Sequence, residues 1–279
     1  MSFRRTGPAA WLPLILGLWP GAAWAIPENW RLGFQPAASP VMQQIEQFHN
    51  MLLYIIVAIS LFVLALLLWI MVRYNQRANP TPSQVHHNTV LEVAWTIVPV
   101  IILVLIAIPS FRLLYYEADI PPADVFIRAV GHQWYWSYEF PKDGGFQFTS
   151  NGLSKPGDNS AADAAHEPHL LGVDNVIEVP VNKVVELEVT GADVIHSWAL
   201  PQMGVKMDAI PGRLNHTWFK ATETGTYYGE CSELCGINHA FMPIEVKVVS
   251  ESDYQTWLGA MKKKFASLDG TGTTQLAAK

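Results

Sequence analysis

The chain has 279 residues, of which 50% are hydrophobic and 15% charged, and its formal net charge is −6. Soluble proteins average roughly a quarter charged residues, so this composition predicts a membrane segment, and the apolar excess falls in the first 115 residues. The modest negative charge argues against nucleic acid as a partner and suits a basic protein.

The N-terminus has the layout of a secretory signal. Arg4 and Arg5 precede the apolar stretch Ala9–Leu18, and Ala23–Ala25 forms an A-x-A cleavage site. Because the apolar stretch is too short to span a bilayer, we expect a cleaved signal peptide over residues 1–25 rather than an uncleaved anchor. The mature chain then begins near Ile26, outside the cytoplasm.

Two apolar runs follow, and together they predict a transmembrane hairpin over residues 26–115. Met51–Val72 is about 33 Å long as a helix, enough to cross a bilayer, and Val90–Phe111 forms the second span. The connector carries Arg73 and Arg77 without an acidic residue, so we expect it in the cytoplasm and both chain ends outside.

Residues 116–250 change to short runs rich in β-branched and aromatic residues, which predict an all-β sandwich or barrel with Greek-key connections. The expected strands are Val125–Val130, Trp134–Phe140, Val176–Val181, Val184–Thr190, His216–Lys220, Thr226–Gly229 and Ile244–Val249. Residues 144–168 predict a long surface loop. In the segment 251–279, a capping box at Ser252 predicts a helix to about Phe265, followed by a disordered tail.

The segment between Cys231 and Met242 gathers four side chains that bind soft metals. Cys231 and Cys235 are the only cysteines of the chain, and His239 and Met242 follow them. Thiolate, imidazole and thioether groups together suit copper. His196, which we expect at the end of a strand, is the candidate for a second imidazole. Two cysteines could bridge a second copper ion, an arrangement suited to electron transfer. A Cys231–Cys235 disulfide and a structural zinc site are the alternatives, although zinc would leave Met242 unexplained.

Nearly the whole mature chain resembles subunit II of the haem-copper cytochrome c oxidases, of the bacterial aa3 type. The resemblance rests on Trp95–Pro99, on Gly131–Glu139, on Asp193–Trp198 and on the cysteine loop. It implies a two-helix membrane hairpin joined to a cupredoxin-like Greek-key domain that binds dinuclear copper A. The implied ligands are the bridging Cys231 and Cys235, the imidazoles His196 and His239, and, as weak ligands, Met242 and the backbone carbonyl of Glu233.

The resemblance also assigns roles outside the copper ligands. Trp134 would be where electrons enter from cytochrome c, with Asp193 and Glu139 in the docking surface. The carboxylate of Glu233 would bind a magnesium ion shared with the catalytic subunit. Glu92, which on its own could simply reach the membrane interface, would mark the entrance of a proton pathway.

The implied function is electron transfer within a proton-pumping oxidase of the bacterial inner membrane. The copper domain would lie in the periplasm, and the chain would pass electrons to a haem-bearing subunit I that reduces dioxygen to water, in a complex with further subunits. The chain itself has no residue set for bond-making catalysis. A related quinol-oxidase subunit, which lacks the copper ligands, and a membrane-anchored copper carrier or assembly protein are the alternatives.

Overall fold

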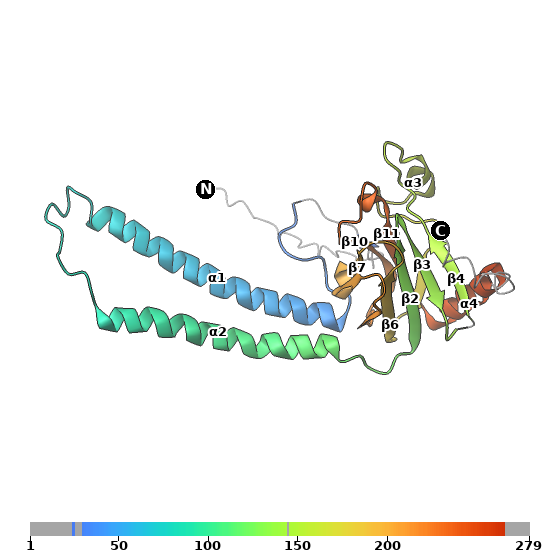
Figure 1. Ribbon diagram of the computed structural model, residues 1–279, viewed down its shortest axis with the longest axis horizontal. Helices are drawn as coiled ribbons and strands as arrows, with labels where there is room; N and C mark the ends of the chain where they lie inside the picture. The colour runs from blue at the N-terminus through green and yellow to red at the C-terminus, as the bar shows by residue number, and fades with distance from the viewer. Residues whose placement is uncertain (1–23, 26–29, 144, 266–279) are drawn as a thin grey trace, which may run out of the picture.

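Two long helices project from one side of a β-domain in this computed structural model, which describes residues 24–25, 30–143 and 145–265 (Figure 1). Helix α1 spans Pro40–Arg73 and helix α2 spans Thr89–Ala118, so each contains one of the predicted spans. Both are long and apolar enough to cross a membrane, and their most apolar windows are not buried inside the protein. The predicted signal peptide lies outside the described residues, except for the two-residue strand β1 (Trp24–Ala25).

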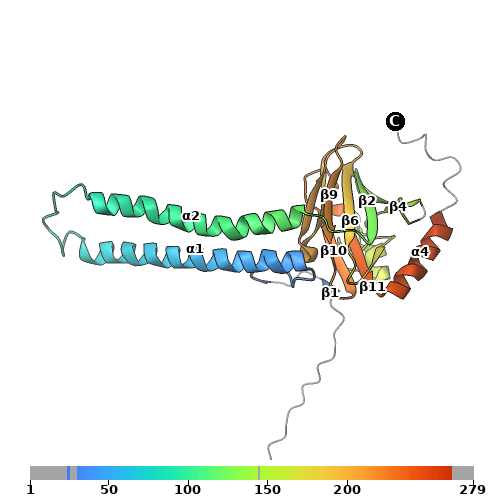
Figure 2. The ribbon, with the colours of Figure 1, turned by 90° about the horizontal axis from the view of Figure 1, so that it is seen from below.

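The start of α1 and the end of α2 are bonded to the β-domain. The Ser39 side chain caps α1 by accepting a hydrogen bond from the Met42 N–H at 3.0 Å, and it donates to the Met203 carbonyl at 2.7 Å. At the end of α2, Trp218 Nε1 donates to the Glu117 carbonyl at 3.2 Å. These contacts attach the start of α1 and the end of α2 to the β-domain. Figure 2 shows the two helices running side by side away from this domain.

Within the described residues, the strands form two sheets. The order of one is β5-β11-β10-β7-β8, with β1 paired to β10, and the order of the other is β4-β3-β2-β6-β9. The strands are β2 (Val125–His132), β3 (Tyr135–Phe140), β4 (Phe146–Ser150), β5 (Ile177–Pro180), β6 (Val185–Gly191), β7 (His196–Leu200), β8 (Val205–Ala209), β9 (Asn215–Phe219), β10 (Gly225–Cys231) and β11 (Pro243–Val249). Two short 3-10 turns, η1 (Pro201–Met203) and η2 (His239–Phe241), interrupt the loops.

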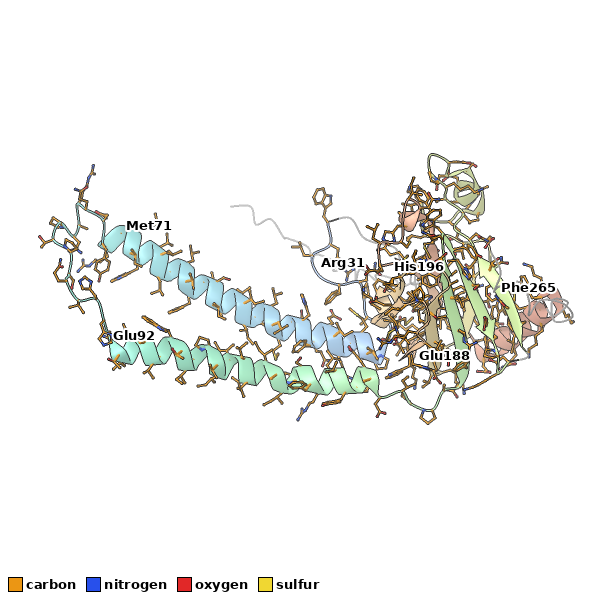
Figure 3. The ribbon with its side chains drawn as sticks, in the orientation of Figure 1. Arg31, Met71, Glu92, Glu188, His196 and Phe265 are labelled. Atoms are coloured by element: carbon orange, nitrogen blue, oxygen red, sulfur yellow. The ribbon has the colours of Figure 1, made fainter. Side chains whose placement is uncertain are left out.

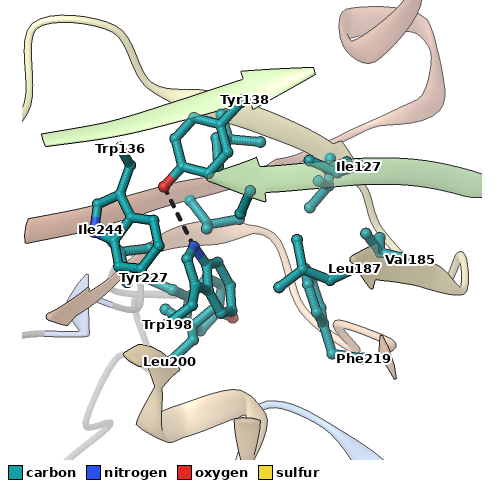
Figure 4. Close-up of a cluster of buried hydrophobic side chains, with 14 of the residues drawn as sticks. Ile127, Trp136, Tyr138, Val185, Leu187, Trp198, Leu200, Phe219, Tyr227 and Ile244 are labelled. Atoms are coloured by element: carbon teal, nitrogen blue, oxygen red, sulfur yellow. Dashed lines mark hydrogen bonds between the residues drawn. The ribbon is translucent and has the colours of Figure 1, made fainter. Parts of the chain in front are cut away.

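The core lies between the two sheets and is rich in aromatic side chains. Trp136 and Tyr138 from β3 are almost fully buried, as are Trp198 from β7 and Phe219 from β9. Trp198 Nε1 donates to the Tyr138 hydroxyl at 3.3 Å, so the polar atoms of these two rings are paired inside the core (Figure 4). Strand β3 therefore supplies two large buried side chains of this core, and one of them, Trp136, donates a hydrogen bond to the carbonyl of Met242 in the cysteine loop.

The predicted β-sandwich with its membrane hairpin is confirmed, but two local predictions were wrong and two short elements were not predicted. Part of the expected surface loop over 144–168 is strand β4, because Phe146 and Phe148 alternate into the core. His196 begins strand β7 rather than ending a strand, and β8 was not predicted. The loop after β4 also contains the short helix α3 (Ser160–Ala165). Helix α4 (Glu251–Phe265) lies where the capping box predicts it, and the tail beyond is outside the described residues.

Candidate metal centre

The cysteine loop, which runs from Cys231 to Met242, connects the antiparallel strands β10 and β11. Cys231 is the last residue of β10, Met242 directly precedes β11, and Glu230 pairs with Pro243 at the base of the loop. On the other side of β10, Cys231 is the register partner of Trp198 on β7. This pairing brings His196, two residues before Trp198, to the first cysteine.

The two cysteines are free thiols that face each other in a buried position. Their sulfur atoms are 3.8 Å apart, and each residue is 4% exposed. A disulfide bond has a length of about 2.05 Å, so the alternative of a Cys231–Cys235 disulfide is not what the structure contains. Metal–thiolate bonds of about 2.3 Å allow both sulfur atoms to bind a common ion across this distance.

Each thiol has its own imidazole. The Sγ atom of Cys231 lies 3.9 Å from Nδ1 of His196, and that of Cys235 lies 3.5 Å from Nδ1 of His239. His196, Cys231 and Cys235 form a buried cluster whose ligand atoms lie within 4.8 Å of one another. The structure thus brings the four strong candidate ligands together with one imidazole on each side of the sulfur pair.

The two weak candidate ligands also lie at this cluster. Met242 Sδ is 3.5 Å from the Cys235 sulfur, and the Met242 side chain is almost fully buried. The Cys231 thiol donates to the backbone carbonyl of Glu233 at 3.3 Å. One weak donor therefore accompanies each cysteine, which leaves the site similar on both sides.

His196 is held by groups on three sides. Its Nε2–H donates to Asp193 Oδ1 at 2.8 Å, which leaves Nδ1 free to face the Cys231 sulfur. The Trp136 ring meets the imidazole edge-on at a centroid distance of 6.0 Å. Gly131 lies against the ring so closely that a Cβ atom there would be 2.8 Å from His196 Cγ. Trp136 and Gly131 were not predicted as site residues because this contact joins separate strands.

Electrostatics makes the two thiols unlike before any metal binds. Burial raises the pKa of Cys231, but hydrogen bonds with His196 and with the backbone of Glu233 and Ser197 outweigh it, and the pKa falls below its usual value. Burial raises the pKa of Cys235, and the nearby Cys231 sulfur raises it further. Cys231 is therefore the thiol that gives up its proton first and presents a thiolate to an incoming metal.

Trp134 lies on the cysteine loop. Its Nε1–H donates to the Cys235 carbonyl at 3.2 Å, and Gln133 Nε2 donates to the same oxygen at 2.8 Å. The Gln133 backbone N–H donates to Asp193 Oδ2 at 2.7 Å. Gly236 has a φ of +124°, and a Cβ there would lie 3.0 Å from the Trp134 ring, so only glycine allows the loop to pass under the indole.

The side chains of Glu139, Glu92 and Glu233 are not part of the thiol cluster. Glu139 forms an ion pair with Arg128 at 2.9 Å on the outer face of the sheet. Glu92 lies in the first turn of α2, where Oε1 is 2.7 Å from His87 Nδ1, at the end of the hairpin far from His196 (Figure 3). The side chain of Glu233 points away from the core, since this residue is exposed.

The donor set fits copper better than any other metal considered. Two thiolates, two imidazoles and a thioether are soft or borderline ligands, and a buried thioether beside thiolates is typical of copper sites. The site lies in a β-sandwich that is joined to a membrane hairpin, so the molecule is a membrane-anchored, cupredoxin-like copper protein.

Comparison with known protein families identifies the relatives of this class. Residues 125–249 match the family model described as the periplasmic domain of cytochrome c oxidase subunit II, and residues 27–113 match that of its transmembrane domain. The chain belongs to the cytochrome c oxidase subunit II family, whose members are electron-transfer subunits with this type of copper domain.

Two relatives agree with this assignment, and one solved structure is also similar to part of the chain. A probable cytochrome c oxidase subunit 2 of Rickettsia bellii is 47% identical over 241 residues, covering 86% of this chain and 88% of the relative. Subunit 2 of Cereibacter sphaeroides is 47% identical over 245 residues, covering 83% and 80%. The crystal structure of the periplasmic domain of subunit II from Bradyrhizobium japonicum is 55% identical, covers 53% of this chain and 99% of that one, and superposes with a TM-score of 0.48.

Proposed function

We propose that this chain accepts electrons one at a time from cytochrome c at a dinuclear copper centre and passes them to haem in the catalytic subunit of its oxidase. That subunit reduces dioxygen to water, coupled to proton pumping. The observation that carries the proposal is the buried pair of thiols, each with its own imidazole. When bound, a copper pair supplies a site that takes up and releases one electron.

The protein's part in this function is to hold the ligands still. Cys231 and Cys235 would bridge the ions, His196 and His239 would each bind one, and Met242 and the Glu233 carbonyl would be the weak ligands. The paired strands at the base of the loop and the Asp193–His196 hydrogen bond restrict these side chains before and after electron transfer. Rigid positioning of this kind keeps the reorganisation on reduction small.

Trp134 is the proposed point where electrons enter. Its indole is half-buried and bonds to the Cys235 carbonyl, so one aromatic ring reaches from the surface to the backbone of a bridging cysteine. Exposed Leu234 and Ile237 beside it offer an apolar patch for a partner. The carboxylates of Asp193 and Glu139 would steer a basic cytochrome c toward this patch.

Two further proposed roles concern Glu233 and Glu92. The exposed carboxylate of Glu233 would bind magnesium together with the catalytic subunit, because a hard cation prefers oxygen ligands. Glu92, at the first turn of α2, would receive protons from the cytoplasm. This requires the connector with Arg73 and Arg77 to lie in the cytoplasm of a bacterium and the copper domain in the periplasm.

The test is the electron paramagnetic resonance spectrum of the full-length chain, purified in detergent and loaded with copper. Hyperfine splitting from two equivalent copper ions is expected for the wild type and for Ser232→Ala, a loop residue outside the ligand set. Cys231→Ser and Cys235→Ser should lose this pattern. A four-line single-copper spectrum in the wild type would contradict the proposal. A chain that never co-purifies with a haem-bearing partner would favour the copper carrier instead.

A further inference from the structure

A cavity lies where the membrane hairpin meets the β-domain. Its volume is about 340 Å³, within the range of about 300–1,000 Å³ that is typical of small-ligand sites. Residues from the start of α1, the end of α2 and strands β8 and β9 line it, and Figure 2 shows α2 ending beside β9. None of these residues belongs to the copper ligand set, so the cavity is a feature separate from the copper centre.

The position of the cavity along α2 corresponds to the headgroup layer of a membrane. The apolar run of the second span ends at Phe111, and the stretch from there to Glu117 is about 9 Å long as a helix. The headgroup layer extends roughly 5–8 Å beyond the hydrocarbon core on each side. Leu114, which lies between these two residues and lines the cavity, is exposed. The cavity therefore borders the apolar surface of the hairpin at the depth where phospholipid headgroups lie.

Glu117 supplies a carboxylate without a partner. Its side chain is half-buried and forms no hydrogen bond or ion pair with the residues that the structure describes. Its backbone carbonyl, in contrast, accepts the Nε1–H of Trp218 at 3.2 Å, which places this residue against β9. A carboxylate that is partly removed from water loses hydration, and binding a cation offsets this loss. The cavity wall therefore favours a ligand with a positively charged group.

The other charged side chains of the cavity wall are already paired with neighbours. Lys206 Nζ lies 3.3 Å from Asp208 Oδ1. His216 Nδ1 lies 3.4 Å from Glu186 Oε1. An anionic headgroup would place a second negative charge beside Glu117. The Lys206 pair is exposed on both sides and therefore weak, so its ammonium group can also turn toward a phosphate that lies farther out.

The remaining walls suit an ammonium group attached to an apolar chain. The buried indole of Trp218 lines the cavity, and the Tyr116 ring packs edge-on against it at a centroid distance of 5.6 Å. Aromatic faces attract ammonium cations. Val41 and Met207 add apolar surface. An ammonium group beside a carboxylate and an indole, with apolar surface next to it, is the chemistry of a zwitterionic phospholipid.

We propose that this cavity binds the headgroup of a phospholipid of the ethanolamine type, from the leaflet on the side of the β-domain. The primary ammonium group donates hydrogen bonds to the Glu117 carboxylate, and the acyl chains lie along the hairpin next to Leu114. Because the Glu117 carbonyl is bonded to Trp218, the bound lipid strengthens the junction between α2 and β9.

The test is native mass spectrometry of the full-length chain in detergent, loaded with copper and titrated with short-chain phosphatidylethanolamine or phosphatidylglycerol. The wild type should retain one phosphatidylethanolamine molecule, and phosphatidylglycerol, which has no ammonium group, should bind at least about tenfold more weakly. Phosphoethanolamine, which has no acyl chains, should also bind at least about tenfold more weakly than the lipid. Thermal unfolding should shift to higher temperature as the concentration of phosphatidylethanolamine rises.

Glu117→Gln should remove the preference for phosphatidylethanolamine over phosphatidylglycerol, whereas Glu117→Asp keeps the charge and should keep the preference. Glu223→Gln, which changes an exposed glutamate away from the cavity, should bind both lipids as the wild type does. An unchanged copper resonance spectrum shows that each variant is folded. A preference for phosphatidylethanolamine that persists in Glu117→Gln, or equal binding of the two lipids by the wild type, overturns the proposal. Equal affinity for phosphoethanolamine and the lipid overturns the assignment to a membrane lipid.

Discussion

The carboxylate of Asp193 accepts the Nε2–H of His196 at 2.8 Å and, through its other oxygen, the backbone N–H of Gln133 at 2.7 Å. One side chain therefore orients a candidate copper ligand and the peptide that leads into Trp134. Burial raises the pKa of Asp193, but the hydrogen bonds from His196, Val194 and Gln133 together lower it below its usual value. The carboxylate is thus ionised at neutral pH, where it holds the Nδ1 atom of His196 toward Cys231.

Asp193→Asn separates this positioning role from the predicted role in cytochrome c docking. The amide cannot accept from both His196 and the Gln133 N–H, so we expect copper affinity to fall about 10- to 100-fold. Copper titration of the purified chain measures this, with Glu139→Gln as the control because Glu139 bonds to Arg128 and not to the site. If copper affinity is unchanged and only the salt dependence of the reaction with cytochrome c decreases, Asp193 is a docking residue.

Gly131→Ala should disturb the same ligand by steric contact. The added Cβ would lie 2.8 Å from both Cγ and Cδ2 of His196, closer than side chains tolerate, so the imidazole must move. We expect an altered copper resonance spectrum and weaker copper binding while the β-domain stays folded. Gly259→Ala in helix α4, where an added Cβ meets nothing, is the matched control and should leave the spectrum unchanged.

Trp134→Phe should slow electron entry without changing the copper site. Phenylalanine keeps an aromatic ring but loses the hydrogen bond from Nε1 to the Cys235 carbonyl. Stopped-flow reduction by cytochrome c should be at least about tenfold slower, as expected when a half-buried aromatic side chain of the proposed contact surface is altered. Reduction by a small-molecule donor should keep its wild-type rate. Equal slowing with both donors would place the defect at the copper centre and not at the docking surface.

Glu92→Ala tests the proposed proton entrance. Glu92 contacts His87 at 2.7 Å at the start of α2, far from the β-domain, so its removal should leave the copper spectrum intact. Oxygen consumption by the assembled oxidase should decrease severalfold if protons enter here. His86→Ala in the same connector is the control. Wild-type turnover in Glu92→Ala would remove this residue from the proton pathway.

The sequence was informative where structure depends on local periodicity. Continuous apolar runs predicted the hairpin, alternation predicted most strands, and the chemistry of one short loop predicted four ligands. The contacts that the sequence did not predict depend on the register between strands that are distant in the sequence. Gly131 touches His196 and Asp193 reaches Gln133 only because β2, β6 and β7 are brought together by packing. Strand β4 was hidden because the residues that flank its two phenylalanines are typical of loops.

Glu245 provides a pH-dependent test of the domain beneath the copper loop. It lies on β11, is 5% exposed, and accepts a hydrogen bond from the Val173 N–H at 3.1 Å. Burial raises its pKa from 4.5 to about 7, and the charge of Glu167 adds to the rise. Between these two values the unfolded chain releases this proton while the folded chain keeps it, so the Glu245 contribution lowers stability as pH rises and is fully unfavourable above about pH 7.

Glu245→Gln keeps an oxygen for the Val173 N–H and removes the ionisation. We expect it to raise the free energy of unfolding by on the order of 1–3 kcal/mol above the raised pKa, and to change it little below the unfolded value. Thermal unfolding of the full-length chain across this pH range measures the difference. Glu223→Gln, which changes an exposed glutamate, should follow the wild type at every pH. A stabilisation by Glu245→Gln that is the same at low and high pH would show that charge at Glu245 is not what limits the stability of the domain.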